Sequence, residues 1–487
     1  MKNLSFGVVL TALTLFSGCG GGGKGLPTST TGGLPNAPPS NASLNGSYAF
    51  VFDGFDAGGS MSAAGSFMAD GNGNLTSGIE DINRHSSVTT NATFTGIYSI
   101  GSDGRGIFTV SSAMGNSTFH FALDTQGNGR FIEFDNSGTR GSGIIKKQDS
   151  RAFSTPAIGG DYALGLNGSN GVGTRVGAVG RFHADGSGNL SQGAIDVNDA
   201  GTLIPTASWN GSYSVSSNGR GTAVLFGTAV HFSFYVVSSS ELFFLCTDFP
   251  TLFRSGLVLS QSGGPFSLTV LKGPAVFNLT GQSTSAESSA ALGQVVTDGL
   301  GGALGLFDEN DAGNVSTKLK FTGAYSIAPN GRGTLDLQVQ PTISESFVFY
   351  VVNQNQALLL ETSGSAVKAG SLEPQSGAPF SDGSFSGRFA VGTLSPAVVS
   401  VPDVSGVASL DGSGNFSETE DQSTPSGMVS NVVVAGTYAA SSEGRASITL
   451  TSAVSGNAAF YAVSPTKLLS IPLDSGNTAP AVLVLEQ

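Results

Sequence analysis

The stretch Asp70-Gly-Asn-Gly-Asn-Leu-Thr-Ser-Gly-Ile-Glu-Asp81 decides the fold, because its pattern returns three more times along the chain. The Asp-Gly start recurs at Asp185, Asp298 and Asp411, at spacings of 115, 113 and 113 residues. A second marker, a tyrosine followed seven residues later by an arginine, returns in step with it. Its four copies are Tyr98/Arg105, Tyr213/Arg220, Tyr325/Arg332 and Tyr438/Arg445. A repeat of this length predicts four modules of one design.

The repeat spacing also divides the chain into segments. We expect β modules at 44–153, 154–266, 267–380 and 381–487, each long enough to bury a core of its own. A signal peptide at 1–18 and a flexible Gly/Ser/Thr/Pro tether at 19–43 precede them.

Each module has an all-β pattern. Phe119, Phe121 and Leu123 alternate with more polar residues, which is the period of a strand with one buried face. Turn signals cut the first module into eight strands, near 46–54, 61–69, 74–83, 91–101, 105–112, 117–124, 130–135 and 140–148. Eight short strands joined by tight turns predict an antiparallel meander, and closure into an eight-stranded β-barrel removes its two bare edges. A two-sheet β-sandwich is the alternative.

The meander sorts the turns into two ends. The turns at Asp70 and Gly104 belong at one end with both module termini, and these turns are nearly the same in every copy. The loops near 55–60, 84–90, 113–116 and 136–139 belong at the other end, where the copies differ. We expect any recognition to differ there, and the 32 phenylalanines favour barrels filled by side chains.

Short motifs add a resemblance. The run Leu44-Asn-Gly-Ser-Tyr48, together with Gly96-Ile-Tyr98, is similar to runs in avidin-like and lipocalin-like barrels. That resemblance implies a barrel that can hold a small ligand at its mouth.

The N-terminus predicts where in the cell the protein is located. An apolar run at 4–16, too short to span a bilayer, follows Lys2. It ends in Leu15-Phe16-Ser17-Gly18-Cys19, which resembles a bacterial lipobox and implies acylation of Cys19, with a plain secretory signal as the rival. Gly20 after the cysteine implies an outer-membrane destination. As a whole, the pattern resembles the tandem β-repeat lipoproteins of bacteria, a resemblance that implies no activity.

Composition excludes several partners and cofactors. A net charge of −13, with charged residues at only 11%, argues against nucleic acid, which needs clustered Lys and Arg. The 70–81 stretch resembles a calcium loop, but Leu75 stands where the loop needs glycine. The four histidines have no zinc-site spacing. We therefore expect no metal and no cofactor, and contact with the membrane only through the N-terminal lipid.

The third predicted strand of each module carries the candidate binding residues. They are Asp81, Asp196, Asp308 and Asp421, with Asn83, Asn198 and Asn310 two residues beyond the first three. A structural role, in which the carboxylates accept loop N–H groups, is favoured over binding. No facing carboxylate accompanies them, as glycoside chemistry would require, so the sequence predicts no enzyme.

The repeated aspartates and arginines form a second candidate set. In a meander, the turns that carry Asp70 and Arg105 are neighbours, so this pair is expected to brace one rim of the module. The equivalent pairs are Asp185/Arg220, Asp298/Arg332 and Asp411/Arg445.

Two function classes follow from these patterns. The first is a non-enzymatic cell-envelope lipoprotein whose modules form a structural, adhesive or recognition surface for an envelope polymer, a glycan or a protein. The alternative is a small-ligand-binding barrel, and a surface hydrolase is less favoured.

Overall fold

The computed structural model describes residues 38–487, except 85–86, 114, 171–172, 228–229, 249–252, 340–342, 395–397 and 453–454. The expected signal peptide, Cys19 and most of the tether therefore lie outside the described residues, as does part of the 84–90 loop. Within the described part of the chain, no helix is long and apolar enough to cross a membrane.

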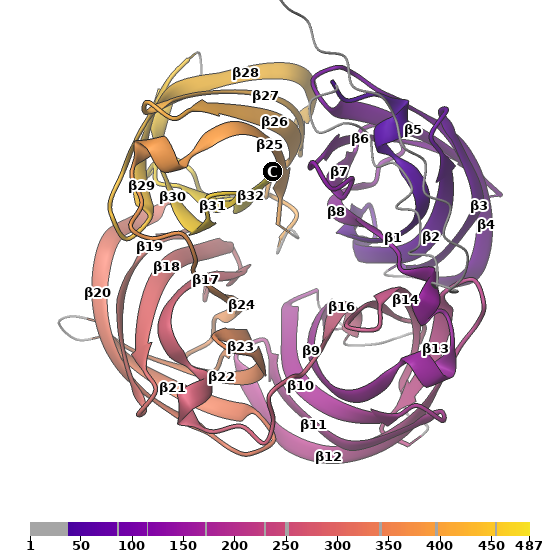
Figure 1. The fold of residues 1–487 in the computed structure, drawn as a ribbon, viewed down its shortest axis with the longest axis horizontal. Helices are drawn as coiled ribbons and strands as arrows, with labels where there is room; N and C mark the ends of the chain where they lie inside the picture. The colour runs from indigo at the N-terminus through magenta and orange to yellow at the C-terminus, as the bar shows by residue number, and fades with distance from the viewer. Residues whose placement is uncertain are drawn as a thin grey trace, which may run out of the picture. The chain divides into compact units, whose positions relative to one another are not determined.

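Four closed barrels of eight antiparallel strands follow one another along the chain (Figure 1). Barrel 1 comprises β1 Asn45–Asp56, β2 Gly59–Asp70, β3 Asn74–Asn83, β4 Val88–Ile100, β5 Arg105–Ser112, β6 Gly115–Leu123, β7 Gly129–Glu133 and β8 Arg140–Lys147. Barrel 2 comprises β9 Gly159–Ser169, β10 Arg175–Asp185, β11 Asn189–Asp199, β12 Thr202–Val215, β13 Arg220–Leu225, β14 Val230–Ser238, β15 Glu241–Cys246 and β16 Phe253–Ser260.

The second half of the chain repeats this order. Barrel 3 comprises β17 Lys272–Gln282, β18 Ser288–Asp298, β19 Gly302–Asp311, β20 Asn314–Ile327, β21 Arg332–Val339, β22 Ile343–Asn353, β23 Gln356–Glu361 and β24 Val367–Pro374. Barrel 4 comprises β25 Ser386–Thr393, β26 Asp403–Asp411, β27 Asn415–Thr424, β28 Gly427–Ala440, β29 Arg445–Thr451, β30 Ser455–Ser464, β31 Lys467–Pro472 and β32 Leu483–Glu486. The prediction of four eight-stranded meander barrels is confirmed, and the sandwich alternative is wrong.

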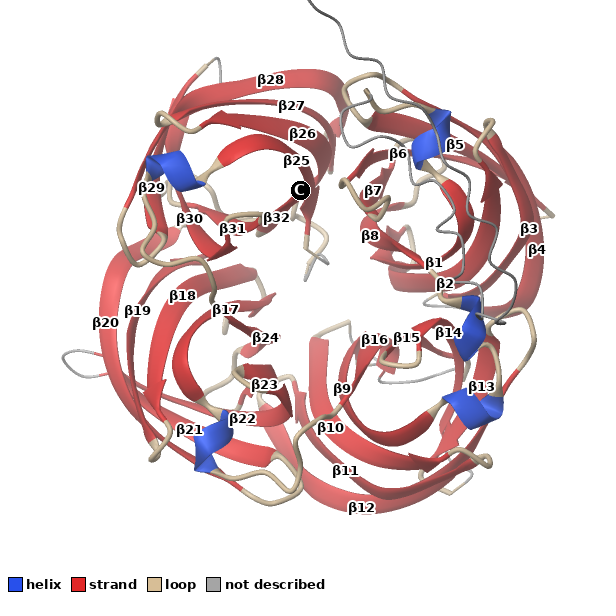
Figure 2. Cartoon of the chain, in the orientation of Figure 1, coloured by secondary structure: helices blue, strands red, loops and turns tan. Residues whose placement is uncertain are grey.

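The described helices are single 3-10 turns before or between the barrels (Figure 2). They are η1 Asn41–Ser43, η2 Ser150–Ala152, η3 Thr155–Ala157, η4 Leu268–Val270 and η5 Asp382–Ser384. The repeated tyrosine of each module hydrogen-bonds to such a turn. The Tyr98 hydroxyl donates to the Leu44 carbonyl at 2.7 Å, and Tyr325 and Tyr438 donate to Leu271 and Phe385 at 2.8 and 3.0 Å. The tyrosine therefore closes the end of the barrel where its chain enters.

The repeated Asp-Gly turn is stabilised by its own carboxylate. Oδ1 of Asp70 accepts the backbone N–H groups of Asn72 and Asn74 at 2.7 and 3.0 Å. Gly71 and Gly73 have φ values of 75° and 113°, a region that favours glycine. The side-chain amide of Asn74 is the main cause that lowers the pKa of Asp70 to about 2, and backbone N–H groups add to it. This hairpin explains why the motif repeats.

The barrel interiors are built from aromatic rings that lie over small residues of the neighbouring strand. Phe121 lies directly opposite Gly106, and a Cβ at Gly106 would come within 2.3 Å of the ring. The equivalent cross-strand pairs are Gly221/Phe234, Gly333/Phe349 and Ala446/Phe460. Glycine at such a site lets a large ring fold back across the strand and fill the interior.

The four barrels form one compact unit, Pro38–Gln487. Apolar clusters join barrel 1 to barrel 2 through residues such as Ala64 and Tyr235, barrel 2 to barrel 3 through Val179 and Tyr350, and barrel 3 to barrel 4 through Leu292. Barrel 4 also contacts barrel 1, through a smaller cluster of Ala122, Ala390 and Val407. The contacts between barrels therefore run in a closed cycle.

Candidate functional site

The candidate aspartate of barrel 1 lies at the seam with barrel 2. Asp81 is completely buried, and the Arg220 guanidinium donates to both of its carboxylate oxygens at 2.8 Å. The Tyr235 hydroxyl donates to Oδ2 at 2.6 Å, and the backbone N–H of Asn91 donates to Oδ1 at 2.7 Å. Every partner is a hydrogen-bond donor, so the buried carboxylate is well satisfied.

The next two seams repeat this arrangement, which we call the seam triad. Asp196 accepts from Arg332 at 2.7 and 2.8 Å and from Tyr350 at 2.8 Å. Asp308 accepts from Arg445 at 2.7 Å and from Tyr461 at 2.8 Å. Burial raises the pKa of each triad tyrosine, and the nearby aspartate raises it further, so the hydroxyls stay protonated donors. Breaking one such buried pair costs about 3 to 5 kcal/mol.

The candidate asparagines strengthen the same seams. The Asn83 side-chain amide donates to the Cys246 carbonyl of barrel 2 at 2.8 Å, and Asn198 donates to the Glu361 carbonyl of barrel 3 at 2.9 Å. Asn310 donates to the Pro472 carbonyl of barrel 4 at 3.2 Å. The structure therefore places these candidate residues in contacts between barrels.

The closing seam differs from the other three. Nδ1 of His120 lies 2.9 Å from Oδ2 of Asp421, and Arg105 is 3.5 Å from Oδ1. Ala122 faces Arg105 across the strand pair, where Tyr235 faces Arg220 in barrel 2. Burial alone would raise the pKa of Asp421, but the His120 hydrogen bond, with the Asn431 N–H and Arg105, holds it below its usual value.

The expected pairing of turn aspartates with arginines in one module is wrong. Among the described residues no ion pair joins Asp70 to Arg105, or their equivalents in the other three modules. The turn aspartates Asp70, Asp185, Asp298 and Asp411 accept N–H groups of their own turns. The arginines Arg105, Arg220, Arg332 and Arg445 instead reach the third-strand aspartate of the preceding barrel around the cycle.

Barrel 1 holds a cavity of about 270 Å³. Seven phenylalanines line it, and each of them makes a ring contact with at least one of the others. Phe52 stacks on Phe131 with ring centroids 5.8 Å apart, and Phe119 meets the same ring edge-on at 5.6 Å. The expectation of filled barrels is therefore wrong for barrel 1, because these rings pack around the wall and leave the centre empty.

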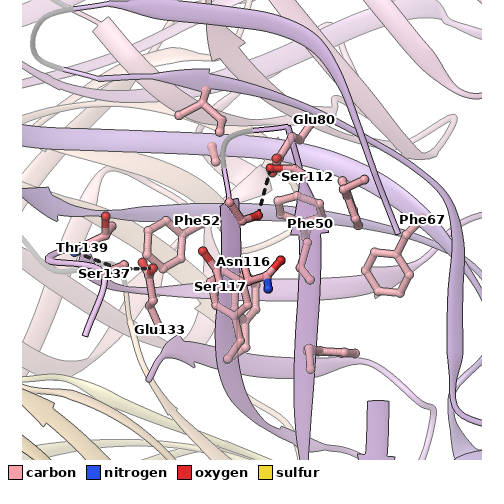
Figure 3. A pocket seen from close by; sticks show the side chains of 18 of the residues that line it. Phe50, Phe52, Phe67, Glu80, Ser112, Asn116, Ser117, Glu133, Ser137 and Thr139 are labelled. Carbon is pink, nitrogen blue, oxygen red and sulfur yellow. Dashed lines mark hydrogen bonds between the residues drawn. The ribbon is translucent and has the colours of Figure 1, made fainter. Parts of the chain in front are cut away.

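Polar groups gather at one end of this cavity. Figure 3 shows Glu80 and Glu133 with Ser112, Asn116 and Ser137 around the phenylalanine walls. β3 and β7, which carry the two glutamates, are four strands apart in a closed barrel of eight and therefore face each other. The mouth lies at the end that carries the divergent loops.

The pKa values of both glutamates are raised. Burial raises the pKa of Glu133 to about 7, although the Ser137 hydroxyl, which donates to Oε1 at 2.8 Å, opposes the rise. Burial likewise raises the pKa of Glu80 to about 7, against the nearby Arg84 guanidinium. Arg84 also lines the cavity, and its charge is paired with Asp56 at 3.0 Å. Near neutral pH each carboxyl can therefore donate or accept a hydrogen bond.

Sequence reasoning missed these cavity residues, although a signal was present. Glu80 precedes the repeated Asp81, and the same inward position holds Ile195, Phe307 and Glu420 in the other modules. A carboxylate in place of an apolar residue at this one position would have marked barrels 1 and 4. No protein-family model matches this sequence, and a search of curated proteins finds no match.

Proposed function

We propose that this protein binds a small, largely apolar molecule inside barrel 1, and that the molecule carries one neutral or cationic polar group. The observation that carries the proposal is the cavity of about 270 Å³, which combines phenylalanine walls with two glutamates at its mouth. An apolar cleft with a few convergent polar groups is the usual form of a small-molecule site.

The chemistry of the walls selects the ligand. Aromatic rings favour an apolar or aromatic body, which gains dispersion contacts that the empty centre lacks. Glu80 and Glu133 would repel an anion, and Arg84 is already neutralised by Asp56. A hydroxyl, amide or amine at the mouth finds a donor or acceptor in either glutamate. The cavity has room for a small organic molecule and none for a folded polymer.

The attachment of the protein to the membrane and the packing of its barrels are part of the same proposal. We propose that acylation at Cys19 holds the four barrels at the cell envelope, and that seams between barrels keep the binding barrel on a rigid support. Replacing Cys19 by serine would release the protein from the membrane fraction. An unchanged membrane fraction would contradict the lipid anchor and leave the binding proposal standing.

A hydrolase is less well supported. Glycoside cleavage needs one carboxyl held as an acid and another kept ionised. The pKa values of Glu80 and Glu133 are raised alike to about 7, and phenylalanine walls offer few partners for sugar hydroxyls. Binding without turnover is therefore the function proposed.

The test uses N-phenyl-1-naphthylamine, a neutral probe that fluoresces in apolar sites. Ala63 lines the cavity, so Ala63→Phe places a ring in the empty space and should reduce the number of probe molecules bound per chain by one. The matched control is Ile97→Phe, which adds a ring at an exposed position on the same barrel and should change nothing. An unchanged probe stoichiometry in Ala63→Phe would refute the proposal.

A further inference from the structure

Barrel 4 lacks a cross-strand contact between a glycine and an aromatic ring that the other three barrels contain. In barrels 1 to 3 a glycine on the third strand lies opposite an aromatic residue on the fourth, and a Cβ on that glycine would come within 2.6 Å of the ring. The pairs are Gly78/Phe94, Gly193/Trp209 and Gly305/Phe321. In barrel 4 the same register position pairs Glu418 with Val434. The ring that fills this space elsewhere is absent.

A cavity of about 210 Å³ occupies the interior of barrel 4, and Glu418 lines it. Glu420 and Gln422 line it as well, since alternate residues of a strand share one face. Nε2 of Gln422 donates to Oε1 of Glu420 at 2.5 Å. Two carboxyl groups therefore lie inside barrel 4, where the ring of the other barrels is absent.

Glu418 is buried, and one of its two carboxyl oxygens lacks a hydrogen bond within the described part of the chain. Glu418 is only 7% exposed, and its Oε1 has no hydrogen-bond partner among the described residues. Burial raises its pKa well above the usual value, and Glu420 beside it raises it further. None of the described residues that line the cavity is Lys, Arg or His. A buried carboxyl group with one unsatisfied oxygen is costly, so a hydrogen-bond donor from outside the chain is favoured at Oε1.

Barrel 3 shows how the chain itself satisfies inward carboxylates. There Nζ of Lys368 lies 2.9 Å from Glu309 and 3.5 Å from Glu361, and all three side chains are largely buried. Glu309 occupies the register position of Gln422, two residues beyond that of Glu420. Barrel 4 has the carboxylates and an open space where barrel 3 has an ammonium group.

We propose that barrel 4 binds a small organic ammonium ion, with its charged nitrogen against Glu418 and Glu420 and its apolar part in the cavity. Phe416, Tyr438 and Phe460 line the same space, and aromatic faces attract cations as well as apolar groups. This site is separate from the cavity of barrel 1, and its ligand is defined by positive charge.

The test uses 2-phenylethylammonium and its neutral analogue of the same shape, 2-phenylethanol, in calorimetric titrations of the purified full chain. All variants carry Ala63→Phe, so that the cavity of barrel 1 is closed. We expect the ammonium ion to bind at least about tenfold more tightly than the alcohol, as a charged hydrogen bond of about 1.5 to 3 kcal/mol implies.

Two variants distinguish the contribution of the Glu418 charge to binding from the contribution of the cavity. Glu418→Gln should reduce affinity for the ammonium ion by about tenfold or more and leave the alcohol unaffected. The double variant Glu418→Gly/Val434→Phe restores the pattern of barrels 1 to 3 and should remove binding of both compounds. Equal affinity for the two compounds, no binding of the ammonium ion, or the same ammonium affinity in Glu418→Gln would each overturn the proposal.

Discussion

Barrels 1 and 2 share one strand frame and differ in what fills it. In barrel 2, Trp209 lies over Gly193 and meets Phe226 with ring centroids 5.3 Å apart. In barrel 1 the equivalent ring is the smaller Phe94, and a cavity of about 270 Å³ stays open. Barrel 1 has seven phenylalanines around that cavity, so aromatic content alone does not fill a barrel. A few inward positions near one end decide between a core and a binding site.

The largest effect is expected when the filled barrel is emptied. Trp209→Ala should lower the free energy of unfolding by about 3 to 5 kcal/mol, because a buried ring is lost and a cavity remains. The same variant should gain a binding site for N-phenyl-1-naphthylamine. Denaturant unfolding and a probe titration measure the two effects. A loss below about 1 kcal/mol would mean that Trp209 does not fill barrel 2.

A smaller effect is expected from adding one ring to each barrel. Ala178 in barrel 2 and Ala63 in barrel 1 occupy the same frame position, opposite Val197 and Ile82. Ala178→Phe should destabilise the protein by about 3 kcal/mol through overpacking. Ala63→Phe has space for its ring and should change stability by less than about 1 kcal/mol. Equal destabilisation by the two variants in chemical denaturation would contradict the difference between the barrels.

The smallest effect concerns a carboxyl group that barrel 1 carries at its mouth and barrel 2 lacks. Glu133 corresponds to Cys246 in barrel 2, and burial raises its pKa to about 7 from an ordinary value near 4.5. The folded state therefore holds a proton that the unfolded chain releases, and stability falls as the pH rises from about 4.5 through 7. Glu133→Gln should remove that fall.

We expect Glu133→Gln to be more stable than the parent by on the order of 2 kcal/mol at pH 8, and equal to it at pH 4. Unfolding curves across this pH range measure the difference. A variant that differs from the parent by the same amount at both pH values would show that Glu133 does not titrate between them.

The sequence was enough to predict the barrels because their turns repeat. The Asp70 hairpin needs its aspartate and its two glycines, which all four modules have, so the motif marks each module. Alternation on strands such as β6 then separates inward from outward residues. Local chemistry therefore fixed the strand count and the closure.

The seams could not be predicted from the same repeat. Arg220 lies 139 residues from its partner Asp81, and Arg332 lies 136 residues from Asp196. In a regular repeat every aspartate has a constant spacing to an arginine of its own module and of the next, so spacing does not tell which pair forms. The cavities could not be predicted for a related reason. The volume of a cavity depends on how several rings from different strands pack together.

Xenon tests the central claim most directly, because it enters apolar cavities and reports their position in a crystal. Crystals of the protein under xenon pressure should show a strong site at the centre of barrel 1, against Phe52 and Phe131, and none inside barrel 2 beside Trp209. A xenon site of equal strength in both barrels, or none in barrel 1, would contradict the account that one repeated frame holds both a filled core and a binding cavity.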